Sequence, residues 1–147
     1  MKNYIVAICL LFFANFCIAC NCAGEVTMQK SILKTDVIVK GTIISKAMFS
    51  KDDHKITGLR MRYIKYTIAI SEVIKGKIKF KKIIIASSSA DCGYRFDIGK
   101  TYLVYADKHK ENKNDTFLYT SICMRTNKFN AIEYKKVKKY CKLKGFC

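Results

Sequence analysis

The stretch CGYRFDIGKTYLVYA, residues 92–106, says most about how this chain folds. It begins with a cysteine, passes through the turn sequence DIGK at 97–100 and enters the apolar segment KTYLVYAD at 100–107. An apolar run rich in Val and Tyr after a glycine-containing turn predicts a β-strand. A further strand, TFLYTSIC at 116–123, is predicted after the polar turn KHKENKND, and it also ends in a cysteine.

Three more strands are predicted upstream of this stretch. The segment DVIVKGTIIS at 36–45 is rich in β-branched residues, and Gly41 marks a predicted bulge. The segment LRMRYIKYTIAISEVIKG at 59–76 alternates over most of its length, and IKFKKIIIASS at 78–88 is another strand. Residues 46–58 between the first two strands are predicted to form a polar connector. Five successive strands with short polar turns predict a small closed barrel or a sandwich.

A short helix is predicted before the first strand. The segment TMQKSILKT at 27–35 places Met28, Ile32 and Leu33 near one helical face. Thr27 has the side chain expected of the N-cap, because its hydroxyl can accept a hydrogen bond from a free backbone N–H of the first turn.

A second helix is predicted at the C-terminal end, in NAIEYKKVKKYCKLKGFC at 130–147. Its apolar residues Ile132, Val137 and Tyr140 are expected to face the strands, and its lysines to face water. The predicted fold class is therefore all-β with flanking helices, compatible with a five-stranded barrel of the oligonucleotide/oligosaccharide-binding type. Other all-β architectures remain alternatives at this level.

Residues 1–19, MKNYIVAICLLFFANFCIA, predict a secretory signal peptide. Lys2 precedes an apolar run that is short for a membrane span, and Ala19 is a suitable small residue before the cut. Cleavage there makes Cys20 the first residue of one exported domain, residues 20–147. The alternative is a lipoprotein signal ending in Ile-Ala-Cys, in which Cys20 carries a lipid anchor and its amine is acylated. The two alternatives exclude each other, since an acylated Cys20 has no free amine.

The six cysteines after the leader predict three disulfides, because an even count in an exported chain is typical of a disulfide framework with fifteen pairings open. A zinc site is disfavoured, since there is no Cys-x-x-Cys pair and both histidines lie far from any cysteine in sequence. No metal or cofactor of its own is therefore expected. The cysteines are numbers 20, 22, 92, 123, 141 and 147.

The formal net charge is +17, and arginine supplies four of the 28 basic residues. Base readout and bidentate phosphate contacts favour arginine, so specific nucleic-acid binding is not predicted, whereas weak polyanion binding is an expected side effect. An enzyme is not predicted either. Ser87, Ser88 and Ser89 offer hydroxyl groups, but no histidine is placed to activate them.

Several stretches taken together resemble a known family. They are CNC at 20–22, DVIVKGTIIS, YTIAISEVIKGK at 66–77, and above all CGYRFDIGKTYLVYA followed by LYTSICMRT at 118–126. Together they are similar to the N-terminal domain of the tissue inhibitors of metalloproteinases and to the wider netrin-like superfamily. Small exported bacterial proteins with the same arrangement of cysteines resemble the chain even more closely. The likeness runs from Cys20 to about Asn130.

This resemblance implies the five-stranded barrel and a disulfide pattern. Carried over by position, the family's pairing implies the bonds Cys20–Cys92 and Cys22–Cys123. The bond Cys141–Cys147 is then left for the last two cysteines.

The resemblance also implies a function and a site. The free α-amino group and the carbonyl oxygen of Cys20 would bind the catalytic zinc of a target metalloendopeptidase, and the chain would be a secreted, monomeric inhibitor. Residues expected to contact the protease are Asn21, Cys22, Ser88, Ser89, Ala90 and Asp91. The alternatives are an exported netrin-like surface or envelope binding module without inhibitory activity, lipid-anchored or not at Cys20, and a secreted polyanion-binding protein.

Overall fold

The structure, a computed structural model, describes Cys20, Cys22, Gly24 and residues 26–52, 60–112 and 115–146. The predicted signal peptide, residues 1–19, lies outside this part of the chain. Within the part that is described, no helix combines the length and the apolar character needed to cross a membrane.

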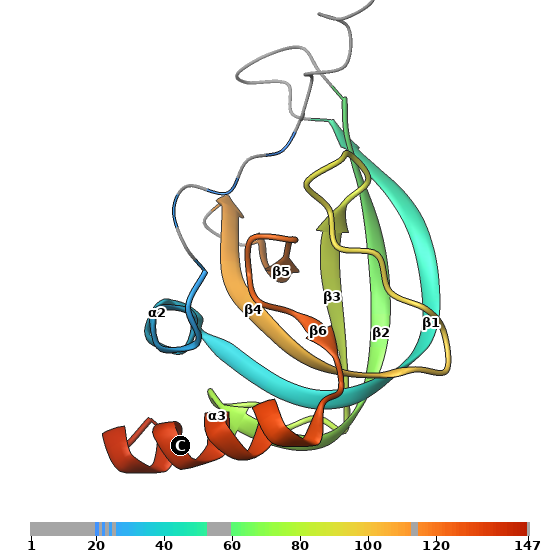
Figure 1. The fold of residues 1–147 in the computed structure, drawn as a ribbon. Helices are drawn as coiled ribbons and strands as arrows, with labels where there is room; N and C mark the ends of the chain where they lie inside the picture. The colour runs from blue at the N-terminus through green and yellow to red at the C-terminus, as the bar shows by residue number, and fades with distance from the viewer. Residues whose placement is uncertain are drawn as a thin grey trace, which may run out of the picture.

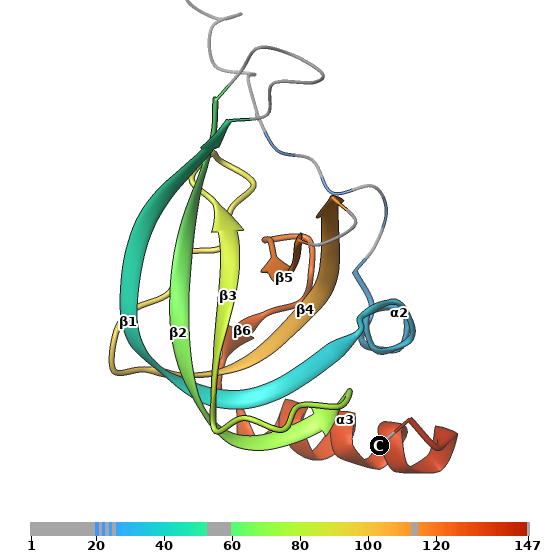
Figure 2. The same ribbon diagram turned by 180° about the vertical axis from the view of Figure 1, so that it is seen from behind.

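Six strands form one sheet, and five of them close into a ring (Figures 1 and 2). Hydrogen bonds join them in the order β1-β2-β3-β5-β4, and β4 pairs with β1 again. β3 and β5 run parallel, whereas the other neighbours in the ring are antiparallel. The predicted closed arrangement of five strands is therefore confirmed. The strands are β1 (Val37–Asp52), β2 (Arg60–Lys75), β3 (Lys82–Ser88), β4 (Thr101–Asn112), β5 (Asp115–Thr120) and β6 (Asn127–Lys128).

The predicted irregularity at Gly41 is confirmed, because the pairing of β1 with β2 shifts register between Lys40 and Gly41. The two strands approach closely there. A Cβ atom at Gly41 would lie 2.5 Å from the Cγ2 atom of Ile68 and 2.7 Å from the carbonyl oxygen of Ala69. Glycine is thus required by contact with the neighbouring strand.

Several predicted strand boundaries are wrong, among them the end of β5, which lies at Thr120 rather than at residue 123. The segment 46–52, predicted as connector, continues β1 as far as Asp52 and pairs with the first half of β2. β4 likewise runs through part of the predicted turn to Asn112, and β3 begins at Lys82 rather than at residue 78. Such segments become strands when a neighbouring strand forms backbone hydrogen bonds with them. The local composition does not show whether such a neighbour is present. The two-residue strand β6, which pairs with β4, was not predicted at all.

Two apolar cores lie on the two sides of the β4 strand. The first fills the ring and includes Val39, Ile68, Ile85 and Phe96 among its buried members. The second lies between the ring and the two helices. Successive side chains of a strand point to opposite faces, and here both faces are covered.

The sequence YLVYA is apolar throughout because of these two cores. Tyr102, Val104 and Ala106 belong to the first core, whereas Leu103 and Tyr105 belong to the second. All five side chains are buried. A strand covered on both faces is expected to show an unbroken apolar run rather than an alternation.

The two helices are α2 (Met28–Lys34) and α3 (Ala131–Lys144), and both were predicted. The Thr27 hydroxyl accepts a hydrogen bond from the backbone N–H of Lys30 and caps α2 as expected. Ile32 is buried in the second core, whereas Leu33 is exposed. The predicted buried face of α2 is therefore correct for Ile32 and wrong for Leu33.

The buried face of α3 is built around Val137 and Cys141, with Tyr134 and Tyr140 partly buried beside them. Ile132 was expected on this face, but its side chain is 68 % exposed. Five residues of helix turn through about 500°, which places Ile132 about 140° around the axis from Val137. The predicted orientation is thus right for Val137 and Tyr140 and wrong for Ile132.

Candidate functional site

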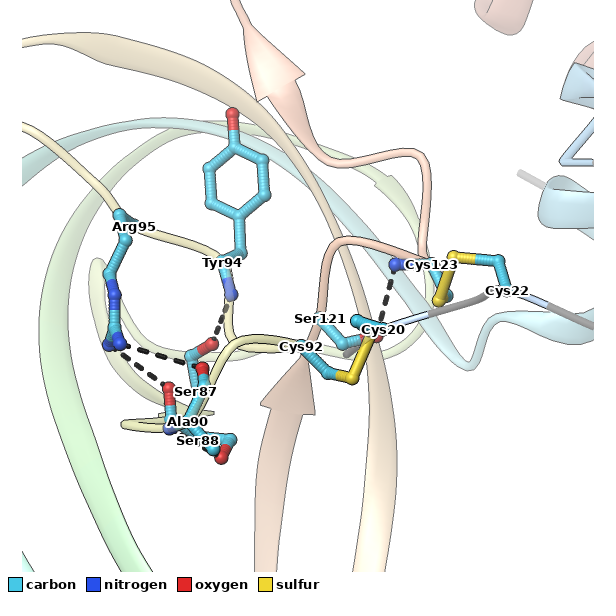
Figure 3. The surroundings of a disulfide bond; sticks show 10 residues. All are labelled: Cys20, Cys22, Ser87, Ser88, Ala90, Cys92, Tyr94, Arg95, Ser121 and Cys123. Carbon is cyan, nitrogen blue, oxygen red and sulfur yellow. Dashed lines mark hydrogen bonds between the residues drawn. A yellow bond between two sulfur atoms is a disulfide. The ribbon is translucent and has the colours of Figure 1, made fainter. Parts of the chain in front are cut away.

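Two disulfides attach the segment before α2 to one end of the ring (Figure 3). Cys20 is bonded to Cys92 and Cys22 to Cys123, with Cα–Cα distances of 5.4 Å in both. Both pairings implied by the resemblance are therefore confirmed. Asn21, between the two bonds, lies outside the described residues.

The third predicted bond, Cys141–Cys147, stays a prediction. Cys141 is disulfide-bonded and buried in the second core. Its predicted partner, Cys147, lies outside the described residues.

The parallel pairing of β3 with β5 brings the two attachment points together. The carboxyl ends of parallel neighbours lie at the same edge of a sheet, and Cys92 and Cys123 each follow one of these strands within a few residues. A bridge between Gly93 and Ser121 and a hydrogen bond of 3.1 Å from the Ile122 N–H to the Cys92 carbonyl join the two segments. Both disulfides therefore attach to one continuous surface.

The predicted protease-contacting segment, residues 88–91, lies directly before Cys92. Ser88 and Ser89 are partly buried, whereas Ala90 and Asp91 are exposed. The Ala90 N–H donates to the Ser88 hydroxyl oxygen at 3.1 Å, and the Gly93 N–H donates to the Ala90 carbonyl at 2.9 Å. The segment is a compact turn. The bond Cys20–Cys92 attaches Cys20 to the residue that follows it.

Arg95 holds this turn from one side (Figure 3). Its guanidinium donates to the Ser88 carbonyl at 3.1 Å, to the Ser89 carbonyl, and to the Ala90 carbonyl at 3.5 Å. A planar guanidinium presents several donors in a fixed arrangement, so one side chain fixes three successive carbonyl groups. Arg95 was not among the residues expected at this site, because the local sequence pattern does not show which carbonyl groups a surface arginine will contact.

Gly93 is the second residue that shapes the turn. It is buried, and a Cβ atom there would lie 1.8 Å from the Ser88 carbonyl oxygen. The next residue, Tyr94, donates its backbone N–H to the Ser87 hydroxyl at 2.7 Å. Burial raises the pKa of the Tyr94 phenol to about 12, so the ring stays neutral.

Arg125 braces the segment that carries the other disulfide. Its guanidinium donates to the Val26 carbonyl at 3.0 Å, just before α2, and forms an ion pair of 2.7 Å with Glu133 of α3. The N-terminal segment is thus held by two disulfides and by one arginine that also contacts the C-terminal helix.

Among the residues that the structure describes, no three His, Cys, Asp or Glu side chains are grouped so that they could hold a metal ion. The end of the ring instead offers backbone groups, two disulfides and the exposed residues Ala90 and Asp91. Such a surface can bind another protein through shape and backbone contacts.

The sequence model of the family described as tissue inhibitor of metalloproteinase matches residues 18–143. The chain belongs to this family. The match covers most of the chain, including both disulfides, all strands of the ring and nearly all of α3. The resemblance inferred from the sequence is thereby confirmed. A search of curated proteins finds no match to this member of the family.

Proposed function

We propose that this protein is a secreted inhibitor of a zinc metalloendopeptidase and that it binds the enzyme through Cys20. Membership of an inhibitor family supports the general function and argues against an enzyme. The observation that carries the finer proposal is that disulfides fix Cys20 and Cys22, the two neighbours of Asn21, to the same end of the ring. In this proposal, residues 1–19 are removed and Cys20 becomes the amino terminus.

The chemistry requires a neutral amine. A catalytic zinc keeps one coordination position for water, and the α-amine and carbonyl oxygen of Cys20 would displace that water as a chelating pair. An α-amine has a pKa of about 7.7–8.0, so deprotonating it at neutral pH costs about 1 kcal/mol. This cost is small for a ligand that is otherwise well placed.

Rigidity is the second requirement. A flexible terminus would lose conformational entropy on entering an active-site cleft, whereas one fixed by two disulfides has lost most of it already. Asn21 would then enter the main specificity pocket. Cys22 and the turn Ser88–Asp91 would contact the cleft beside it.

Secretion belongs to the same proposal. Disulfides form and persist in oxidising compartments outside the cytosol, and the structure contains the bonds of Cys20 and Cys22. The predicted signal peptide would deliver the chain to such a compartment.

The test begins with mass spectrometry of the exported protein and titration against a panel of zinc endopeptidases. A free Cys20 amine is expected, with inhibition of at least one enzyme. Adding one alanine before Cys20 should abolish this inhibition, because it moves the amine away from the zinc. An alanine added after Cys147 is the matched control and should have no effect.

Two outcomes contradict the proposal. Inhibition that survives the added N-terminal alanine would rule out chelation by Cys20. An acyl group on Cys20 would remove the ligand and leave the netrin-like binding module as the better description of the protein.

A further inference from the structure

A second surface with its own chemistry lies at the start of β3. The connection between β2 and β3, residues 76–81, continues into Lys82 and reads GKIKFKK. Phe80 projects from it with 75 % of its side chain exposed, and Lys77, Lys79 and Lys81 around it are also exposed. Exposed single apolar residues are ordinary, but this phenylalanine stands among cations and beside an apolar groove.

The groove has a volume of about 670 Å³ and lies between β2, β3 and β5. It exists because β3 pairs with β5 through Ile85, Ala86 and Ser87 and with no earlier residue of the strand. On the N-terminal side of Ile85, β3 is not paired with β5. Its lining includes the exposed residues Lys82, Phe80 and Ile84, the lysine Lys65, and the core residue Ile83 with Leu118 packed against the core.

The groove is apolar in its walls and cationic at its edge. Ile84 is 56 % exposed although it lies in the middle of a strand, and the core residue Ile83 lines the same groove. Lys65 lies over the ring of Phe49, with its Nζ atom 3.9 Å from the centroid. The described residues that line the groove include no aspartate or glutamate. A ligand that fits must be apolar and anionic at once.

We propose that the Phe80 face, formed by residues 77–82 together with Lys65 and Ile84, binds the surface of an anionic lipid bilayer. Lipid phosphates would meet the lysines, while Phe80 and Ile84 enter the boundary between headgroups and acyl chains. A second copy of this chain would bring the same lysines together, which a formal net charge of +17 disfavours. A sulfated polysaccharide would satisfy the lysines but leave Phe80 and Ile84 in water.

This face and the disulfide-linked end lie at opposite ends of β3. The strand runs from Lys82, next to the Phe80 face, to Ser88, where the turn before Cys92 begins. At about 3.3 Å per residue the two ends are about 20 Å apart. In Figures 1 and 2, β3 starts near α3, and its arrowhead points to the other end of the ring. Bilayer binding would therefore leave the Cys20 end accessible, and this inference does not depend on the proposed function.

The experiment is cosedimentation of the purified, disulfide-bonded protein with vesicles of phosphatidylcholine, with and without phosphatidylglycerol. We expect binding to the anionic vesicles alone. The double variant Lys79→Gln/Lys81→Gln should lower partitioning about 25-fold, at about fivefold per lysine. The variant Phe80→Ser should lower it about tenfold through lost apolar contact.

Two control variants match these changes. Lys30→Gln/Lys34→Gln removes the same charge from α2, where both lysines are exposed and line a pocket with Cys22 and Cys123 at the disulfide-linked end. Leu33→Ser removes an apolar side chain of the same helix that is 54 % exposed. Both should bind vesicles nearly as well as the unaltered protein. All the substituted residues are exposed, so thermal unfolding should confirm that each variant is folded.

The outcomes are decisive in both directions. Absence of binding to anionic vesicles would overturn the inference, as would equal losses in the two lysine pairs, because charge alone would then explain the binding. Phe80→Ser without effect on vesicles would also overturn it. Loss of heparin binding in Lys79→Gln/Lys81→Gln, with no loss in Phe80→Ser, would then assign the face to a soluble polyanion.

Discussion

At the scale of single residues, the turn before Cys92 is fixed by Arg95 and Gly93. The arginine holds three carbonyl groups from outside, and the glycine leaves room for the Ser88 carbonyl inside. Neither residue was expected to contact the protease. Both set the conformation of residues 88–91, which are expected to contact the protease. Arg95 and Gly93 are therefore positioning residues for the proposed interface.

Replacing Arg95 by glutamine should loosen the turn and change global stability little. Arg95 is exposed, and a typical hydrogen bond contributes about 1 kcal/mol net. Hydrogen exchange at the Ala90 and Gly93 amides should accelerate about tenfold, which mass spectrometry or NMR can measure. Lys100→Gln is the control for lost surface charge. Unchanged amide hydrogen exchange in the Arg95 variant would show that the turn keeps its conformation without the arginine.

Replacing Gly93 by alanine should destabilise the protein by more than about 2 kcal/mol, because the new methyl group would overlap backbone atoms of Ser88. Gly99→Ala is the comparison. Gly99 has open space around it but a φ of +79°, so its cost should be about 1 kcal/mol. Urea unfolding of both variants gives the difference. Equal costs would mean that the clash at Gly93 is relieved by movement of the turn.

At the scale of elements, α3 is attached to the ring in two ways. Val137 is buried in the second core, and on the same face of the helix Lys138, at 2.8 Å, and the Tyr134 hydroxyl contact Glu72 of β2. The apolar contact should supply most of the stability, since exposed ion pairs contribute little.

Val137→Ala should cost about 2 kcal/mol of unfolding free energy, and Ile132→Ala should cost close to nothing. The first change leaves a cavity in a core, whereas the second removes a side chain that is already mostly in water. Chemical denaturation of the two variants tests the orientation of the helix directly. Comparable costs for the two variants would support the orientation expected from the sequence, which placed both side chains on the buried face.

The contact of Glu72 with α3 should depend on pH. Its hydrogen bonds with Lys138 and with Tyr134 lower the pKa of the Glu72 carboxyl from the ordinary value of 4.5. A carboxyl with a lowered pKa in the folded state stabilises the protein above its unfolded pKa and loses this contribution as the pH falls through the lowered value.

Glu72→Gln should therefore destabilise the protein slightly at neutral pH and not at all well below the lowered pKa. Unfolding free energies of the two proteins, measured across this range, should converge as the pH falls. Lys135→Gln, which removes a neighbouring charge of α3 without this contact, should show no such convergence. A gap that is constant with pH would contradict the role of the charged carboxyl.

At the scale of the whole molecule, two long-range disulfides close the chain upon itself. They join residues 72 and 101 positions apart, and in the chain-entropy model each bond contributes about 4–5 kcal/mol. The bonds also hold the N-terminal segment on a ring that has its own apolar core. Stability and the proposed function thus depend on the same covalent links.

The double variant Cys22→Ser/Cys123→Ser should lose up to about 4–5 kcal/mol of stability while keeping the bond between Cys20 and Cys92. Denaturant titration measures the loss, and mass mapping under non-reducing conditions verifies the remaining bond. If the variant loses inhibition by more than its unfolded fraction explains, the second disulfide orients the terminus. Full inhibition would show that one bond suffices.

The five strands of the ring and the two helices could be predicted from local patterns of residues, and the family from the resemblance of several stretches. The bulge at Gly41, the cap at Thr27 and the apolar run YLVYA could all be identified from neighbours in the chain. The disulfides of Cys20 and Cys22 were inferred correctly, but through family resemblance. Six cysteines taken alone left fifteen pairings open.

The other features depend on tertiary contacts. Residues 46–52 form a strand because β2 lies beside them, and Ile132 faces water because Val137 sets the orientation of the helix. Arg95 reaches the carbonyls at 88–90 because the chain turns back on itself at Gly93. The parallel pairing of β3 with β5 places Cys92 beside Cys123. Each of these features depends on contacts between residues that lie far apart along the chain or across a turn. The local sequence does not show which residues will make such contacts.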